Sequence, residues 1–217
     1  MEAVEIRKEN GTLASGRDII TTRTMKHNQH QTIKEKMGKW RGRVTFTSLE
    51  VVGEEAEKLE AMLSAAVNMP AEIFEKHLAR LRELCTVREM TFENQIVLSG
   101  RSVFARRLAN DTTYTGIINW GALGTSSTAI SDAQTQLVAE VKRKGVATVA
   151  RTDDSVTLRF FYSKSDTNGT YEEFGTFIDG TSASNSGQMF NRVLTGGWVK
   201  SALEALTVTV QFDLNAA

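Results

Sequence analysis

Apolar and polar residues alternate through the second half of the chain, most regularly over residues 155–163 and 204–214. Side chains of a β-strand point alternately to its two faces, so this pattern predicts strands with one buried face and one face in water. The apolar positions are Val156, Leu158 and Phe160 in the first stretch, and Leu206, Val208, Val210 and Phe212 in the second.

Turn sequences rich in Asp, Asn, Gly and Ser separate these segments, at residues 152–154, 166–169 and 179–187. We therefore predict an antiparallel β-sandwich over residues 91–217. Its strands are expected over residues 117–125, 144–150, 155–163, 170–180, 187–194 and 204–214. Its core is expected to include Leu158, Phe160, Phe174, Phe190, Val208 and Val210.

A helical period replaces the alternation over residues 54–67 and 71–87, where apolar residues recur on one face. A break of three residues that ends at Pro70 separates the two segments and predicts an αα-hairpin, whose apolar stripes need a partner. We also predict a strand over residues 43–52 and short helices over 100–109 and 132–142. The fold class is α+β: an extended arm (1–40), a strand plus helical hairpin (41–90) and the sandwich (91–217).

Charge is balanced over the whole chain, with 26 basic and 26 acidic residues, but residues 1–43 hold ten Lys or Arg against five Asp or Glu. A segment this polar buries too little apolar area to offset its ordering entropy, so we expect residues 1–40 to order by docking on another subunit. The small number of aromatic residues argues against nucleic acid as the partner. The candidate docking residues are Arg17, Arg23, Lys34, Lys36, Arg41 and Arg43.

Cys85 is the only cysteine, which excludes an intramolecular disulfide and suits a reducing compartment. The chain has neither a signal-peptide pattern nor an apolar run near the roughly 18 residues of a membrane span. We therefore expect a protein that is made in the cytoplasm and does not enter a membrane.

Candidate metal ligands and nucleophiles are few. His27 and His30 could bring two imidazoles to one metal ion on a helix, but no third ligand is near in sequence. Cys85 and His77 are separated by eight residues, about 12 Å of helical rise, which is too far for a catalytic dyad. We expect no metal and no cofactor.

Two pairs of neighbouring acidic residues are candidates for acid–base chemistry. Glu172 and Glu173 are adjacent in a predicted strand and face opposite sides, so they cannot flank one bond. Asp153 and Asp154 lie in a predicted turn. The segment from Gly121 to Gly124 lacks the Gly-Lys-Ser/Thr sequence of a phosphate-binding loop, and we expect no catalytic site.

A longer pattern extends over residues 91–214. An Asn-containing strand comes first, followed by a helix that begins Gly-Arg and by a strand with the sequence Ala-Leu-Gly-Thr. Spaced Leu, Glu and Arg residues come next, and then a strand with the pattern Glu-x-Gly-x-Phe and a strand that contains Arg. A last segment with Lys, Leu and Val closes the pattern. The matching residues are Asn94, Gly100, Arg101, Leu108, residues 122–125, Leu137, Glu140, Arg143, Glu173, Gly175, Phe177, Arg192, Lys200, Leu206 and Val208. This order resembles a β-sandwich domain that recurs in virion structural proteins of tailed bacteriophages.

The chain departs from that pattern at two points. Ser126 replaces a glycine after the Ala-Leu-Gly-Thr strand, and about ninety residues precede the domain, which usually begins near the start of the chain. The charged pattern residues Glu140, Arg143, Glu173 and Arg192 fall within or beside strands, where an unpaired charge is costly. We expect them to pair and to specify the fold rather than to catalyse.

The resemblance implies a non-enzymatic structural protein of a tailed-phage virion, in the neck, tail or fibre attachment or as capsid decoration. Such a protein forms a symmetric homo-oligomer, contacts other virion proteins and reaches the virion after synthesis in the host cytoplasm. The alternative is a carbohydrate- or receptor-binding module displayed on the particle, with its site on the loops at residues 179–187 and 196–198. Its candidate aromatic residues are Tyr114, Trp120 and Trp198.

Overall fold

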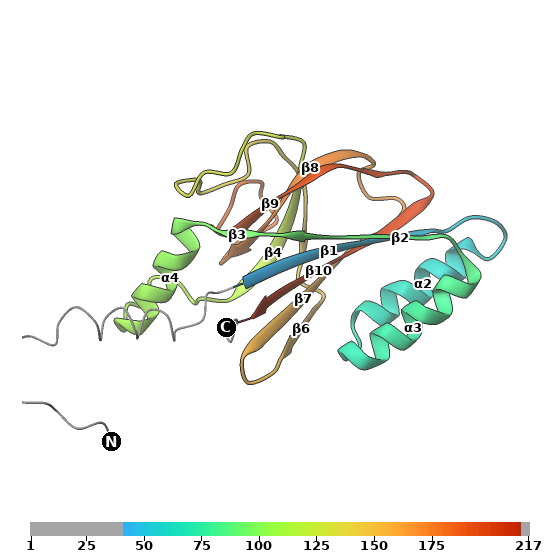
Figure 1. Cartoon of the computed structure of the whole chain (residues 1–217), viewed down its shortest axis with the longest axis horizontal. Helices are drawn as coiled ribbons and strands as arrows, with labels where there is room; N and C mark the ends of the chain where they lie inside the picture. The colour runs from blue at the N-terminus through green and yellow to red at the C-terminus, as the bar shows by residue number, and fades with distance from the viewer. Residues whose placement is uncertain (1–40, 214–217) are drawn as a thin grey trace, which may run out of the picture. The chain divides into compact units, whose positions relative to one another are not determined.

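The computed structural model describes residues 41–213, which contain ten strands and three helices. The strands form two five-stranded sheets in which all neighbours are antiparallel, so the predicted α+β antiparallel β-sandwich is confirmed (Figure 1). The first sheet has the order β2 (Val87–Glu93), β1 (Arg41–Glu50), β10 (Glu204–Asp213), β7 (Ser155–Tyr162), β6 (Thr148–Arg151). The second has the order β3 (Gln95–Ile96), β9 (Gln188–Lys200), β8 (Gly169–Ile178), β4 (Ile118–Gly124), β5 (Glu140–Gly145).

The main core lies between the two sheets and consists of the alternating apolar residues of their facing sides. The six predicted core residues are each at most 2% exposed. Phe46 of β1 packs edge-to-face against Phe174 and Trp198 of the second sheet, with ring centroids 5.8 and 5.5 Å apart. Edge-to-face aromatic pairs add to the free energy gained by burying the rings.

The strand β1 is an interior strand of the first sheet, between β2 and β10. It pairs with β10 along its whole length, from Arg41 opposite Asp213 to Glu50 opposite Glu204, and with β2 on its other side. The predicted boundary near residue 91 is therefore wrong, because β1 and β2 belong to the sandwich. The pairing joins segments more than 150 residues apart, and no local sequence pattern reveals such a partner.

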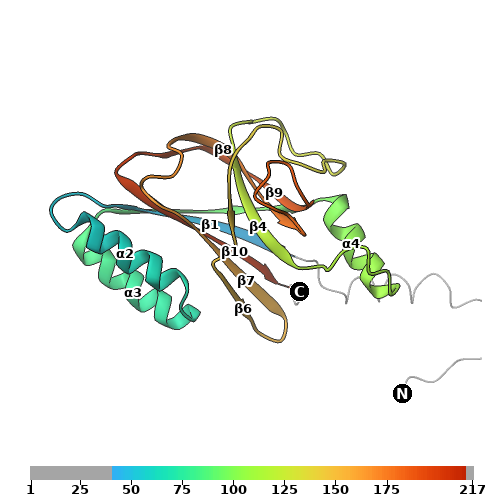
Figure 2. The ribbon, with the colours of Figure 1, turned by 180° about the vertical axis from the view of Figure 1, so that it is seen from behind.

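The helices α2 (Ala56–Val67) and α3 (Ala71–Leu84) form the predicted hairpin and pack on the outer face of the first sheet (Figures 1 and 2). That face was expected to be in water, but Arg159 of β7 is only 2% exposed. Its guanidinium lies over the Phe74 ring at 4.3 Å and donates to the Met69 carbonyl at 2.8 Å. The hairpin thus finds the partner for its apolar stripe within its own chain. The buried residues of this cluster include Leu49, Val51, Leu59, Leu63, Phe74, Leu78, Leu81 and Ala205.

The helix α4 (Leu98–Leu108) lies close to its predicted position and packs on β9. A Cβ at Gly100 would lie 2.4 Å from the Phe190 carbonyl oxygen, so only glycine allows this approach.

The helix predicted over residues 132–142 is absent. Glu140 to Lys142 belong to β5, which pairs with β4, and the residues before them form a loop. The strand predicted over residues 144–150 is divided between β5 and β6, because the chain passes from the second sheet to the first at Val146 and Ala147. Within residues 41–213 no helix is both long and apolar enough to cross a bilayer.

Truncation of Val208 to alanine tests this core. Val208 is fully buried between Phe46 and Phe160 in the first sheet, so its truncation should lower the free energy of unfolding by about 1–3 kcal/mol. The matched control is Val149→Ala on the edge strand β6, where Val149 is 59% exposed and the expected change is within about 0.5 kcal/mol. Equal losses in chemical denaturation would contradict the assignment of the core.

Candidate functional site

A fully buried ion pair lies on the outer face of the second sheet. Glu173 projects from β8 and Arg192 from β9, and Arg192 Nε donates to Glu173 Oε2 at 2.7 Å. Both side chains are 0% exposed. Desolvating two charges is costly unless hydrogen bonds occupy their remaining donor and acceptor positions. A loop supplies three such bonds, whereas Arg192 Nη2 has none.

That loop, residues 125–139, connects β4 to β5 and covers the ion pair. The backbone amides of Val138 and Ala139 donate to Glu173 at 3.2 and 2.8 Å, and Arg192 Nη1 donates to Gln134 Oε1 at 3.0 Å. Gly124 leaves room for the carboxylate, because a Cβ there would lie 2.5 Å from Glu173 Oε1. The ion pair therefore holds the β4–β5 loop against the sheet.

Apolar residues fix the same loop. Leu137 and Ile130 pack against Ala122, Phe177 and Met189 on the outer face of the second sheet. This side of the sandwich thus carries a small second core, with the charged pair buried beside it.

A second ion pair joins Glu140 and Arg143 of β5. The two are bidentate, with both N–O distances at 2.7 Å, and their side chains are at most 4% exposed. Arg143 Nη1 also donates to the Thr181 carbonyl at 2.9 Å and to Ser186 Oγ at 2.6 Å, and the Asn185 amide donates to Glu140. This pair therefore holds the β8–β9 loop, residues 179–187.

The structure thus brings the four charged pattern residues into two separate ion pairs, each of which fixes one loop. Sequence reasoning missed Gln134 and the loop amides, because their roles depend on the path of the β4–β5 loop. Glycine at position 124 is the only local signal of a side chain seated against the strand.

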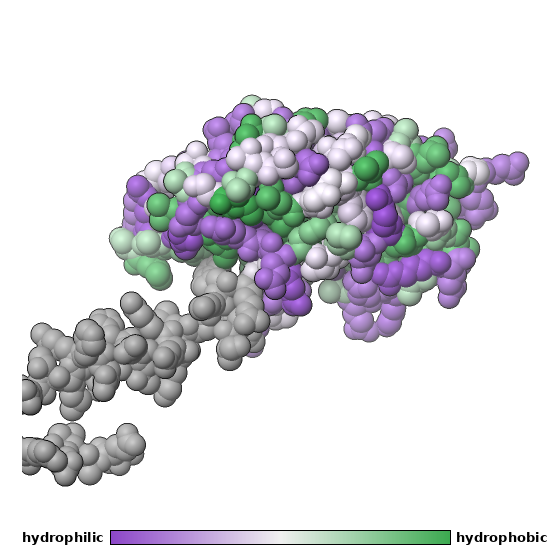
Figure 3. All heavy atoms as spheres, turned by 45° about the horizontal axis from the view of Figure 1, so that its top comes forward, coloured by the Kyte–Doolittle hydropathy of each residue, from purple (hydrophilic) through white to green (hydrophobic). Residues whose placement is uncertain are grey.

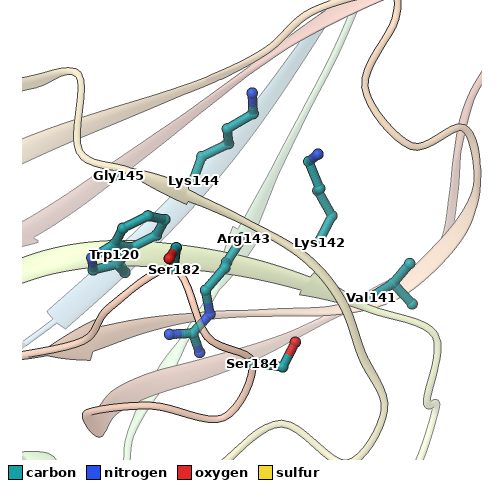
Figure 4. A pocket seen from close by; sticks show the side chains of 8 residues that line it. All are labelled: Trp120, Val141, Lys142, Arg143, Lys144, Gly145, Ser182 and Ser184. Atoms are coloured by element: carbon teal, nitrogen blue, oxygen red, sulfur yellow. The ribbon is translucent and has the colours of Figure 1, made fainter.

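A pocket of about 380 Å³ lies beside the second ion pair and touches the loop proposed for carbohydrate binding (Figure 4). Arg143 extends towards the serines of that loop, whereas Lys142 and Lys144 extend to the other side of β5. The guanidinium of Arg143 lies 6.0 Å from the centre of the half-buried Trp120 ring. The lining residues are Trp120, Val141, Lys142, Arg143, Lys144, Gly145, Ser182 and Ser184.

The other candidate aromatic residues are less accessible than expected. Trp198 is only 4% exposed, because its ring packs on Phe46 and is covered by the Arg88 guanidinium at 4.2 Å. It is therefore a core residue, and its assignment as an exposed sugar-stacking residue is wrong. Tyr114 is half-buried and packs against the main core.

The proposed docking residues of the arm fall in two groups. Arg41 begins β1, and Arg43 lies within it and pairs with Asp213 at 3.3 Å. Both are strand positions of the first sheet, so they do not belong to an arm. The remaining candidates lie outside residues 41–213; they are Arg17, Arg23, Lys34 and Lys36.

Of the candidate metal ligands and nucleophiles, His77 and Cys85 lie within the described residues. His27 and His30 lie outside the described range, and His77 is half-buried on α3. The Cys85 thiol donates to the Leu81 carbonyl at 3.2 Å, and burial, with a smaller contribution from the charge of Glu50, raises its pKa. Among residues 41–213 no three His, Cys, Asp or Glu side chains are grouped closely enough to hold a metal ion.

Comparisons of the chain with family models, with curated proteins and with solved structures give no match.

Replacement of Glu173 tests the role of the buried pair. Glu173→Gln leaves Arg192 buried without a countercharge and should lower the free energy of unfolding by about 3–5 kcal/mol. The matched control is Glu72→Gln in the exposed Glu72–Lys76 pair on α3, where the expected change is at most about 0.5 kcal/mol. A loss below about 1 kcal/mol for Glu173→Gln in urea unfolding would show that the pair does not stabilise the fold.

Proposed function

We propose that this chain is a non-enzymatic structural component of a tailed-phage virion, in the neck, tail or fibre attachment or as capsid decoration, and that it assembles as a symmetric oligomer. The proposal rests on the resemblance over residues 91–214 and on the use that the fold makes of its charged residues. We propose the virion as its location, with other copies of itself and other virion proteins as its partners.

The observation that carries the proposal is the burial of the charged pattern residues. Glu173 and Arg192 are 0% exposed, and Glu140 and Arg143 bind one another and a loop. A catalytic carboxylate has to reach the substrate, and these oxygens already accept bonds from the loops and from arginine. Their arrangement favours a structural role for the pattern.

Charge supports contacts between copies. Residues 1–43 hold ten basic and five acidic residues, so the remaining residues, 44–217, hold 16 basic and 21 acidic ones. The two parts of one chain therefore carry opposite net charges of equal size, and a symmetric assembly can pair them between neighbours. The hairpin α2–α3 offers exposed acidic residues for this contact, among them Glu57, Glu75 and Glu83.

Exposed apolar residues on the edge strands also favour assembly. Met90 on β2, Val149 on β6 and Val141 on β5 are 53%, 59% and 43% exposed. Figure 3 shows hydrophobic residues scattered among hydrophilic ones on one face of residues 41–213. Edge strands with exposed apolar side chains are sites where another chain can pack or pair.

A second candidate is a carbohydrate-binding module, favoured by the pocket beside residues 179–187. Trp120 supplies an aromatic face for a sugar ring, and Ser182 and Ser184 supply hydroxyl groups. Glycan binding in solution that is lost in Trp120→Ala would support this function over a purely structural one.

The structural proposal is tested by the basic segment. Deletion of residues 1–39 removes eight of the basic residues and leaves every strand described within residues 41–213. It should therefore abolish incorporation into virions and reduce the number of subunits in the oligomer without unfolding the sandwich. Native mass spectrometry, thermal unfolding and recovery in purified virions give the three readouts. Normal incorporation of the deleted chain would contradict the docking role.

Charge variants test whether the positive charge of residues 1–39 causes the loss of incorporation. Replacing Arg17, Arg23, Lys34 and Lys36 by glutamate should reduce incorporation as the deletion does. The matched control exchanges Arg for Lys and Lys for Arg at the same four positions, which keeps the charge and should keep incorporation. Charge reversal of the exposed hairpin glutamates should restore assembly to the glutamate variant if the hairpin is the acidic partner.

A further inference from the structure

Lys200, the last residue of β9, is buried without a carboxylate partner. The residue is 1% exposed, and its Nζ donates to Asn168 Oδ1 at 2.7 Å. An ammonium group carries three N–H donors, and a buried charge normally binds an opposite charge. Among residues 41–213, no carboxylate oxygen lies within 4.0 Å of this nitrogen.

Asp166, the acidic residue whose charge acts most strongly on Lys200, is engaged elsewhere. Asp166 binds Lys142 at 3.1 Å and Lys144 at 2.8 Å, and it accepts a bond from the Ser163 amide. Burial would raise the pKa of Asp166, but these hydrogen bonds outweigh it and lower the pKa to about 2, so the group is ionised at neutral pH. Two other lysines therefore share the negative charge that could have neutralised Lys200.

Burial makes the charged form of Lys200 less favourable than it is in water. Burial lowers its pKa, and the more distant charges of Asp166, Glu204 and Glu60 oppose this effect only in part. A neutral lysine amine is a nucleophile, and desolvation is a common way in which proteins activate it.

Strand pairing holds the amine against its target. Asn168 immediately precedes Gly169, and Gly169 is the register partner of Lys200 across β8 and β9. This pairing places the Asn168 side chain beside Nζ. Asn168 is itself exposed, which leaves a path for a small leaving group into solvent.

We propose that Lys200 and Asn168 form an intramolecular isopeptide bond. The neutral Nζ attacks Asn168 Cγ and a bond forms between Nζ and Cγ. The bond between Cγ and Nδ2 breaks, and Nδ2 leaves as ammonia with a proton that Nζ gives up. The reaction needs no oxidant and no other reactant, and its product ties the start of β8 to the end of β9.

A competing reaction releases ammonia at the same residue. Asn168 precedes a glycine, and attack of the Gly169 amide nitrogen on Asn168 Cγ would give a cyclic imide. Both products lack one ammonia, so an intact mass does not separate them. Only the isopeptide bond protects the chain from trypsin cleavage after Lys200, and only the imide can form when Lys200 is replaced.

The experiment uses the purified full chain. Intact mass spectrometry should show the loss of one ammonia relative to the sequence. Digestion with trypsin should leave the bond after Lys200 uncut, and tandem mass spectra should show peptide 165–192 joined to peptide 193–217. Lys200→Arg and Asn168→Ala should each abolish the joined species.

Lys164→Arg is the matched control, because the Lys164 carbonyl accepts a bond from Asn168 Nδ2 whereas no hydrogen bond joins Lys164 Nζ to that side chain. This variant should retain the loss of ammonia and the joined peptides. A wild-type chain of full mass with normal cleavage after Lys200 would overturn the proposal and leave the pair as a hydrogen bond. Loss of ammonia that persists in Lys200→Arg would also overturn it, in favour of the imide.

Discussion

The sandwich depends on the pairing of β1, the first strand within residues 41–213, with β10. β1 lies between β2 and β10, and without it the first sheet would separate into two parts. Its partner β10 ends at Asp213, so the pairing closes a loop of more than 150 residues. Closing a long loop costs entropy that only non-local contacts repay. Val44 and Phe46, both fully buried in the main core, provide part of this compensation.

The outer face of each sheet is covered by a segment of the same chain, and each of these segments lies over a buried charged group of the sheet. The hairpin α2–α3 covers Arg159 on the first sheet, and the β4–β5 loop covers Glu173 and Arg192 on the second. These charged groups bind carbonyl oxygens, amides and one another. Such arrangements fix the position of a cover on a sheet, because a shifted cover would leave the charges without partners.

The alternation of apolar residues was sufficient to predict the class of fold and the core residues of the sandwich. It also led to the outer face of β7 being assigned to water, since alternation alone does not tell a wet face from a face under a helical hairpin. Arg159 shows the difference: a charged residue at a polar position is buried once Phe74 lies over it. The place of β1 in the first sheet could not be predicted in this way, because it depends on pairing with β10, which is distant in the sequence.

Local helical spacing misled the prediction over residues 132–142. There, the pairing of β5 with β4 and the binding of two loop amides by Glu173 override the local preference. The environments of two single residues, Trp198 and Lys200, depend on tertiary contacts in the same way. Trp198 is buried because β9 places it against Phe46, and Lys200 lacks a carboxylate because Asp166 binds Lys142 and Lys144.

Native-state hydrogen exchange of the full chain tests the dependence of the sandwich on its first strand. If β1 is integral to the first sheet, its central amides, from Val44 to Ser48, exchange only on global unfolding and show the same protection free energy as those of β10 and β7. A protection free energy for β1 that is several kcal/mol lower than that of β10 would contradict this, because β1 would then detach while the remaining sandwich stays folded.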